Sequence, residues 1–183
     1  DTIAIPSQTK IKIDSAFVGS CTNGRIEDMR EVARILKNRH IAPGVVFKIV
    51  PSTDDVWRQS MDEGLFTIFK DAGALISNAG CAGCAAGQVG QNGPGEVTIS
   101  TGNRNFPGKQ GNGSVYLSSP ASAAASAVAG YITDENNISL PGVNILIKGT
   151  YSGTVSDMDG NYTLTMTSSE NSLVYSFMPI LPS

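Results

Sequence analysis

Hydrophobic positions in the first 130 residues alternate between two spacings. Short apolar runs that are typical of buried strands occupy residues 12–20, 42–51, 74–78, 95–100 and 114–119. Between them, residues 21–40 and 53–73 repeat apolar side chains at helical spacing, and residues 120–130 open with a proline suited to a first helical turn. Strands that alternate with helices predict an α/β fold, a layered domain with a largely parallel sheet.

Both longer helical segments contain residues that define their faces and ends. In the first, Thr22 or Asn23 is placed to cap the helix. The second is interrupted at Gly64 and ends at Gly73. The apolar face of the first helix consists of Ile26, Met29, Val32, Ala33 and Leu36.

The pattern changes after residue 130, where helical spacing disappears. Short alternating runs such as residues 142–150 are separated by turn residues, and Asp159-Gly160 marks a hairpin ahead of another alternating run. We therefore predict two domains: an α/β domain at residues 1–130 and a partial, truncated all-β sandwich unit at residues 131–183.

Composition and charge exclude several classes of partner. The chain has 183 residues, 40% hydrophobic and 16% charged, which is sufficient for a packed core. A net charge of −3 argues against binding to nucleic acid or to an anionic membrane surface. No apolar run is long enough to span a bilayer. The opening residues have neither an initiating Met nor a secretion signal, so we expect a piece of something longer.

The chemistry of the chain centres on three cysteines, Cys21, Cys81 and Cys84. Three thiols are too few for a disulfide scaffold, which favours a reducing compartment such as the cytoplasm. Both cysteine turns and the loop around Arg104 follow predicted strands. They should therefore converge at the carboxyl edge of the sheet, where ligands of such sheets bind.

Four interpretations of the thiols compete. A redox dithiol leaves Cys21 unexplained, and a structural zinc site wants four ligands, whereas the one histidine, His40, is expected to be solvated near a helix end. Three inert buried cysteines would not explain the glycines around the pair. A cubane iron–sulfur cluster held by three thiolates keeps its fourth iron open for a substrate oxygen.

The stretches "FVGSCTNGRIEDMR", "GCAGC", "EVTISTGNRNFPGKQG" and "YLSSPASAAASAVAG" resemble, in order and spacing, the cluster-binding domain of the aconitase and isopropylmalate isomerase large-subunit family. The resemblance covers about residues 10–132. It implies a 4Fe-4S cluster held by Cys21, Cys81 and Cys84. It also implies that Asn103 lies by the cluster and that Arg104 binds a substrate carboxylate. Lys109 replaces a second family arginine and loses its planar fork.

The activity that this resemblance implies is reversible dehydration of a hydroxy-di- or tricarboxylic acid, with the cluster as Lewis acid. "GRIEDM" is closer to the isomerase branch, which serves leucine biosynthesis. The family's base serine belongs to a swivelling domain or small subunit, and its acid histidine lies upstream of the matched region. We therefore expect a hydro-lyase fragment without catalytic residues of its own, inactive alone, whose partners are a small hydroxy-acid and that swivel subunit.

Residues 129–178 resemble a different family, the carboxypeptidase-regulatory-like β-sandwich found ahead of TonB-dependent transporters. "LPGVNILIKGT", "GTVSDMDGNYTL" and "LVYSF" carry this resemblance, which implies a periplasmic module. Because no linker separates the two parts, we hypothesise a recombined or artificially joined chain. The alternative function is a non-catalytic binding or structural module in which the β-sandwich is the working part.

Overall fold

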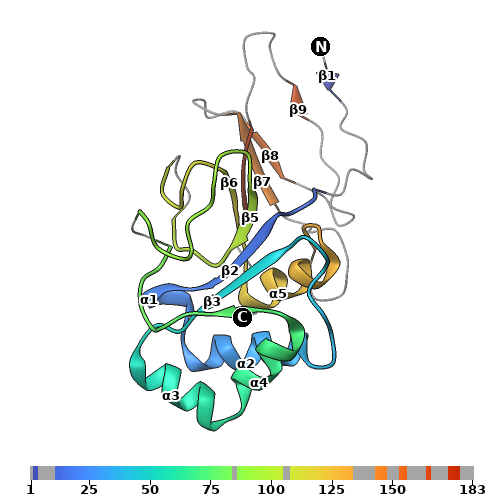
Figure 1. Ribbon diagram of the computed structural model, residues 1–183. Coiled ribbons are helices and arrows are strands. Elements are labelled where there is room, and N and C mark those ends of the chain that lie inside the picture. The colour runs from blue at the N-terminus through green and yellow to red at the C-terminus, as the bar shows by residue number, and fades with distance from the viewer. Residues whose placement is uncertain are drawn as a thin grey trace, which may run out of the picture.

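The computed structural model describes residues 2–3, 11–83, 86–104 and 108–133, and the backbone of four later strands (Figure 1). The first part consists, in order, of β2 (Ser15–Gly19), α1 (Ser20–Asn23), α2 (Ile26–Leu36), β3 (Val46–Val50), α3 (Asp54–Asp62), α4 (Leu65–Ala72), β4 (Leu75–Ile76), β5 (Val97–Ser100), β6 (Ser114–Leu117) and α5 (Pro120–Ala129).

These strands form one parallel sheet in the order β4-β3-β2-β5-β6, which confirms the predicted α/β layer. Ser15 at the start of β2 is in register with Val46 on one side and Thr98 on the other. The chain builds outward from β2 through β3 and β4, then returns to add β5 and β6 on the opposite side. The order of the strands therefore reverses between β2 and β5, where α/β sheets open a crevice for ligands.

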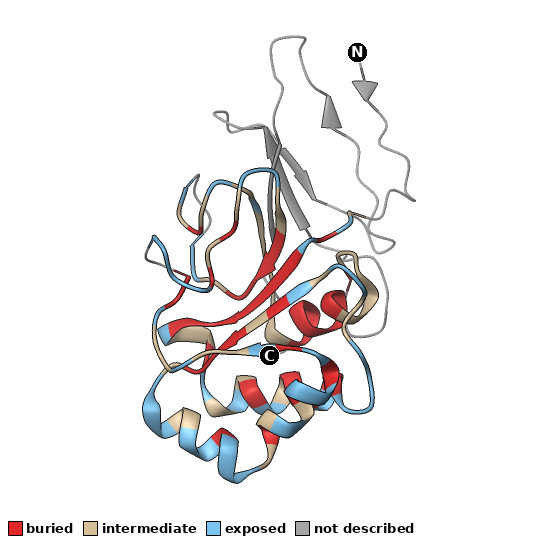
Figure 2. Cartoon of the chain, in the orientation of Figure 1, coloured by how far each residue is buried: buried red, intermediate tan, exposed pale blue. Residues whose placement is uncertain are grey.

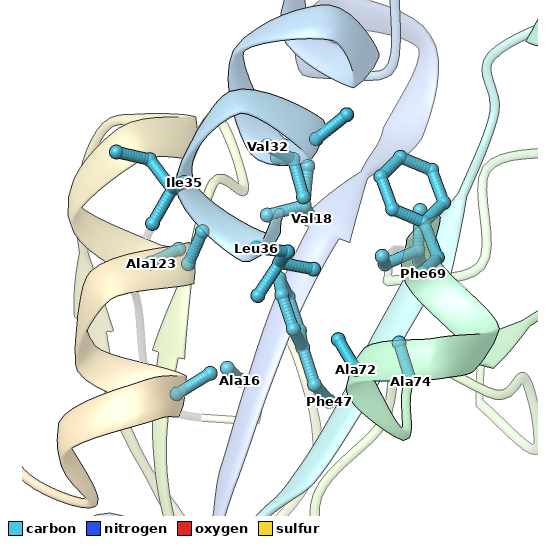
Figure 3. Close-up of a cluster of buried hydrophobic side chains, with 14 of the residues drawn as sticks. Ala16, Val18, Val32, Ile35, Leu36, Phe47, Phe69, Ala72, Ala74 and Ala123 are labelled. Atoms are coloured by element: carbon cyan, nitrogen blue, oxygen red, sulfur yellow. The ribbon is translucent and has the colours of Figure 1, made fainter. Parts of the chain in front are cut away.

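Helices α2, α4 and α5 cover one face of the sheet, with α2 between the other two (Figures 1 and 3). Val32 and Leu36 of α2 point toward Val18 of β2 and Phe47 of β3, and Ile35 points toward α5 (Figure 3). All five side chains are at most 4% exposed, and buried residues follow β2 and the inward side of the helices (Figure 2). Each of these side chains, fully buried, contributes about 1.5–3 kcal/mol.

The opposite face of the sheet is covered by the loop that carries the paired cysteines. Phe17 of β2 and Val50 of β3 form a small apolar cluster there with Ala82. A Cβ atom at Gly83 would lie 3.2 Å from the Phe17 ring, and one at Gly90 would lie 2.6 Å from it. The small residues of this loop therefore let it lie directly on an aromatic ring.

The ends of the helices agree with the sequence in one case and differ in another. Gly64 and Gly73 flank α4 with φ of +74° and +95°, so both predicted breaks are confirmed. The predicted caps at Thr22 or Asn23 are wrong, because both residues are in the short helix α1. Helix α2 begins after Arg25, whose backbone N–H donates to Asp28 Oδ2 at 3.0 Å.

Residues after α5 continue to pack on the α/β layer as far as Thr133. Ile132 N–H donates to the Ile11 carbonyl at 2.9 Å, and Thr133 is fully buried. The Ser126 hydroxyl donates to the Thr133 carbonyl and accepts from the Thr133 N–H, both at 3.0 Å. The domain boundary placed at residue 130 stays a prediction.

The later strands are β7 (Val143–Ile147), β8 (Gly153–Val155), β9 (Leu164–Thr165) and β10 (Leu173–Phe177). Strands β10, β7 and β8 form an antiparallel sheet in that order, and β9 pairs with β1 (Thr2–Ile3). The predicted turn at Asp159-Gly160 lies outside the described residues, and the complete sandwich stays a prediction. Among the described helices, none has both the length and the apolar character to cross a bilayer.

We predict that Ser126→Ala lowers the free energy of unfolding by about 1–3 kcal/mol, because it deletes the buried hydroxyl that accepts from the Thr133 N–H and donates to the Thr133 carbonyl. Ser122→Ala is the control. It makes the same change in the same buried helix, where the Ser122 hydroxyl accepts from the Ser119 side chain. Urea unfolding of both variants measures the difference, and equal losses would contradict the role of the Ser126–Thr133 pair.

Candidate functional site at the carboxyl edge of the sheet

The first cysteine lies in a tight turn at the end of the central strand. Gly19 has φ of +154°, and a Cβ atom there would collide with the Val50 carbonyl, so only glycine fits. Ser20 follows with φ of +78°, a conformation that is uncommon for a residue with a side chain, and is 2% exposed. This turn places the Cys21 thiol at the surface of the carboxyl edge.

The loop after β3 joins this turn to the second cysteine turn. Ser52 N–H donates to the Gly24 carbonyl at 2.8 Å, and Gly80 N–H donates to the Pro51 carbonyl at 3.0 Å. Cys81, which directly follows Gly80, is exposed like Cys21, and neither thiol is in a disulfide. Two adjacent residues of one loop therefore hold the turns of Cys21 and Cys81 at the same edge.

The loop after β5 is tied to the Cys21 turn from the other side. The Thr101 hydroxyl accepts from the Gly19 N–H at 3.1 Å, and Asn23 Nδ2 donates to the Thr101 carbonyl. Asn103 and Arg104 come next in this loop, and both are exposed. The edge therefore brings together, from three strands, two of the predicted thiols and the predicted arginine loop.

The remaining predicted site residues have different outcomes. Lys109 is half-buried in the loop that leads to β6, while Cys84 lies outside the described residues. Within residues 11–83, 86–104 and 108–133, no three His, Cys, Asp or Glu side chains are grouped so that they could hold a metal ion. His40 is exposed beyond the end of α2, as expected for a solvated side chain.

Buried amide side chains behind the edge were not anticipated from the sequence. Asn92 is 7% exposed; its Nδ2 donates to Thr98 at 3.3 Å, and its Oδ1 accepts from the Gly113 N–H at 2.9 Å. Gln110 is 4% exposed and bonds Ser100 and Gly90. In the sequence both belong to glycine-rich stretches that look like solvated loop. Their position beside glycines that turn sharply was the only indication of this role.

A hollow of about 540 Å³ lies beside the cysteine turns. Its described lining residues are Ser52, Thr53, Asp54, Trp57, Asn78 and Ala79. The Asp54 carboxylate accepts from Arg58 Nε at 2.7 Å, and none of these lining residues is a Lys or Arg. The described lining therefore offers no cationic side chain that could pair with a carboxylate.

Burial also affects the charge next to the Cys21 turn. Burial in the first turn of α2 raises the pKa of Asp28, against the opposing effect of the bond from the Arg25 N–H and of the Arg25 charge. Asp28 in turn fixes the start of α2 by accepting that bond. The carboxylate therefore acts as a helix cap behind the turn.

Comparison with known proteins agrees with this arrangement. Residues 4–130 match the model of the Aconitase family (aconitate hydratase). The chain belongs to this family. The family resemblance carried by the cysteine and arginine motifs is thus confirmed. Residues 128–180 match the model of the CarboxypepD_reg-like domain, so the two matches overlap at the junction and leave no linker.

Curated relatives of this aconitase-family chain are dehydratase subunits. It is 53% identical over 129 residues to the "Probable 3-isopropylmalate dehydratase large subunit" of Methanothermobacter thermautotrophicus, an overlap of 69% of this chain and 31% of the relative. It is 48% identical over 134 residues to the 3-isopropylmalate dehydratase large subunit of Acetivibrio thermocellus, covering 72% and 32%. The chain thus spans about a third of the length of the curated relatives it matches.

We predict that Gly24→Ala destabilises the Cys21 turn, because its Cβ atom would lie 2.7 Å from the Ser20 carbonyl and 2.8 Å from the Val50 carbonyl. We expect a loss of about 1–3 kcal/mol in the free energy of unfolding, as for other overpacked sites. Gly80→Ala is the matched control, since a Cβ atom there meets nothing within 4 Å. Thermal unfolding of both variants tests this, and a Gly24→Ala protein as stable as the Gly80→Ala protein would contradict it.

Proposed function

We propose that the α/β part holds a 4Fe-4S cluster through Cys21, Cys81 and Cys84 and binds a carboxylate of a hydroxy-di- or tricarboxylic acid through Arg104 and Lys109. It thereby serves as the cluster-binding part of a hydro-lyase of the 3-isopropylmalate dehydratase type. The observation that carries the proposal is the convergence of the Cys21 and Cys81 turns on one loop at the carboxyl edge.

The described donors suit such a cluster in their chemistry. Thiolates are the ligands that iron–sulfur clusters prefer, and both described thiols are exposed and outside any disulfide. The space in front of Gly80 is open, so that its backbone could approach a large inorganic group closely. The proposed third donor is Cys84, which directly follows Gly83 in the sequence.

The cluster and the neighbouring side chains have different roles at the proposed site. When bound, the cluster supplies a Lewis-acid iron that polarises the substrate hydroxyl. Arg104 offers a planar guanidinium that pairs with a carboxylate through two parallel hydrogen bonds. Lys109 adds a single point charge, and Asn103 offers an amide beside the cluster. These residues bind and orient the acid; none of them is proposed to move its protons.

Proton transfer therefore requires groups outside these positions. We infer that a small subunit or swivelling domain supplies the base, in keeping with the words "large subunit" in the relatives' names. His40 is exposed on the α2 side of the layer and is not proposed as the acid. These 183 residues alone should bind the acid without turning it over.

Oxygen-free reconstitution with iron and sulfide should give a brown protein with broad visible absorbance and equal amounts of iron and sulfide. Cys21→Ser, Cys81→Ser and Cys84→Ser should each remove most of the colour, because each deletes a proposed thiolate. His40→Ala should leave it unchanged. A colourless protein that binds one zinc ion would contradict the proposal and favour the non-catalytic alternative.

Gly80→Ala should fold normally, because its methyl group has room in the metal-free chain, but it should load less cluster.

We predict that Arg104→Ala weakens binding of citrate or an alkyl-substituted malate to the loaded chain by about 10–100-fold, the worth of a charged hydrogen-bonded pair. Lys109→Arg should tighten binding, because it restores the planar fork of the family arginine. Titration calorimetry measures both. Arg39→Ala, which removes an exposed arginine beyond α2, is the control. Equal effects of Arg104→Ala and Arg39→Ala would rule out carboxylate binding at Arg104.

A further inference from the structure

A continuous set of hydrogen bonds connects the arginine loop with the paired-cysteine turn. Gly102 N–H donates to Ser100 Oγ at 3.0 Å, and the Ser100 hydroxyl donates to Gln110 Oε1 at 2.7 Å. Gln110 Nε2 donates to the Gly90 carbonyl at 2.8 Å, and Gly90 N–H donates to the Ala82 carbonyl at 3.3 Å. The amide of Gln110 is the side chain in this path that joins the two loops.

This path is shielded from water. Ser100 is fully buried and Gln110 is 4% exposed. Breaking a buried hydrogen bond costs more free energy than breaking an exposed one, because water cannot take the place of the lost partner. The contacts of Gln110 should therefore be kept while the edge is folded.

A second pair of bonds attaches the same loop. The Gln110 carbonyl accepts from the Asn92 N–H at 2.8 Å, and Gln91 Nε2 donates to the Gly83 carbonyl at 2.9 Å. Gln110 thus hydrogen-bonds the loop after the cysteine turn through both its backbone carbonyl and its side-chain amide. Because it directly follows Lys109, the position of that lysine backbone is fixed by the same contacts.

The geometry requires an amide at position 110. Oε1 accepts from the Ser100 hydroxyl while Nε2 donates to the Gly90 carbonyl, and only a side chain with both functions satisfies the two partners. An ionised carboxylate of the same size keeps the first bond, but it would place negative charge against the Gly90 carbonyl oxygen. Protonation of that carboxyl would return the missing donor.

We propose that Gln110 is a positioning residue that sets the spacing between the Cys81 turn and the loop carrying Arg104 and Lys109. This inference rests on the proposed function, in which one side of the edge binds the cluster and the other binds the carboxylate of the same acid. Small errors in such spacing are costly, because both groups must reach one molecule at once. Gln110 acts through the two loops and does not touch the substrate.

Gln110→Glu tests this positioning role. Gln88→Glu is the matched control, because it is the same substitution at an exposed position of the cysteine loop. Amide hydrogen exchange of the metal-free chain at neutral pH should accelerate by about tenfold or more at residues 82–92 and 101–104 in Gln110→Glu, and not in Gln88→Glu. After correction for intrinsic rates, lowering the pH toward 5 should reverse the acceleration, since a buried carboxyl facing a carbonyl has a raised pKa.

Several outcomes would overturn the positioning role. These are unchanged exchange in Gln110→Glu, acceleration spread equally over α2 and β3, or acceleration that does not respond to pH. Should Gln110→Glu fail to fold, Ser100→Ala cuts the same path at its other end and must accelerate the same two segments. Exchange is measured without metal, so it decides the positioning role separately from cluster loading of the wild-type chain, which decides the proposed function.

Discussion

Two hydrogen bonds hold the two cysteine turns together: the Ser52 N–H donates to the Gly24 carbonyl, and the carbonyl of the preceding Pro51 accepts from the Gly80 N–H. The first bond follows from the parallel register of β2 and β3, with Gly19 opposite Val50, and the second from the pairing of β3 with β4, with Ile49 opposite Ile76. A side chain at Gly19 or Gly24 would push the turn off the backbone of the neighbouring strand. The two thiol turns therefore lie close together because of strand pairing. Gly19 and Gly24 are glycines because a Cβ atom at either position would collide with the Val50 carbonyl of the paired strand.

The helices and strands of the α/β layer could be predicted because buried faces determine the spacing of apolar residues along the sequence. The face of α2, the glycine breaks around α4 and the proline at the start of α5 each depend on residues a few positions apart. The start of α2 could not be predicted, because Asn23 bonds Thr101 and so serves a distant loop instead of its own helix. The central place of β2 likewise depends on long-range pairing.

The candidate site was predictable to a similar extent. Glycine-rich turns after strands pointed to one edge, and the structure brings Cys21, Cys81 and Arg104 to it. The support behind that edge was hidden, because the sequence does not reveal that Phe17 underlies the cysteine loop or that Gln110 is buried. Polar residues among glycines have the composition of a solvated loop. Only their hydrogen-bond partners, six to 21 positions away, show that Asn92 and Gln110 are buried supports.

The bond between Ile132 and Ile11 also affects how this layer can be combined with other sequences. The segments at which the chain enters and leaves the α/β layer are adjacent and antiparallel, with Lys12 opposite Tyr131. Both connections of the layer to other sequence therefore lie at the same place. Sequence added beyond that point need not cross the sheet or thread past the helices. A foreign module could follow Thr133 with little disturbance to the edge that carries the cysteines, since that edge belongs to the ends of the strands and these connections to their beginnings.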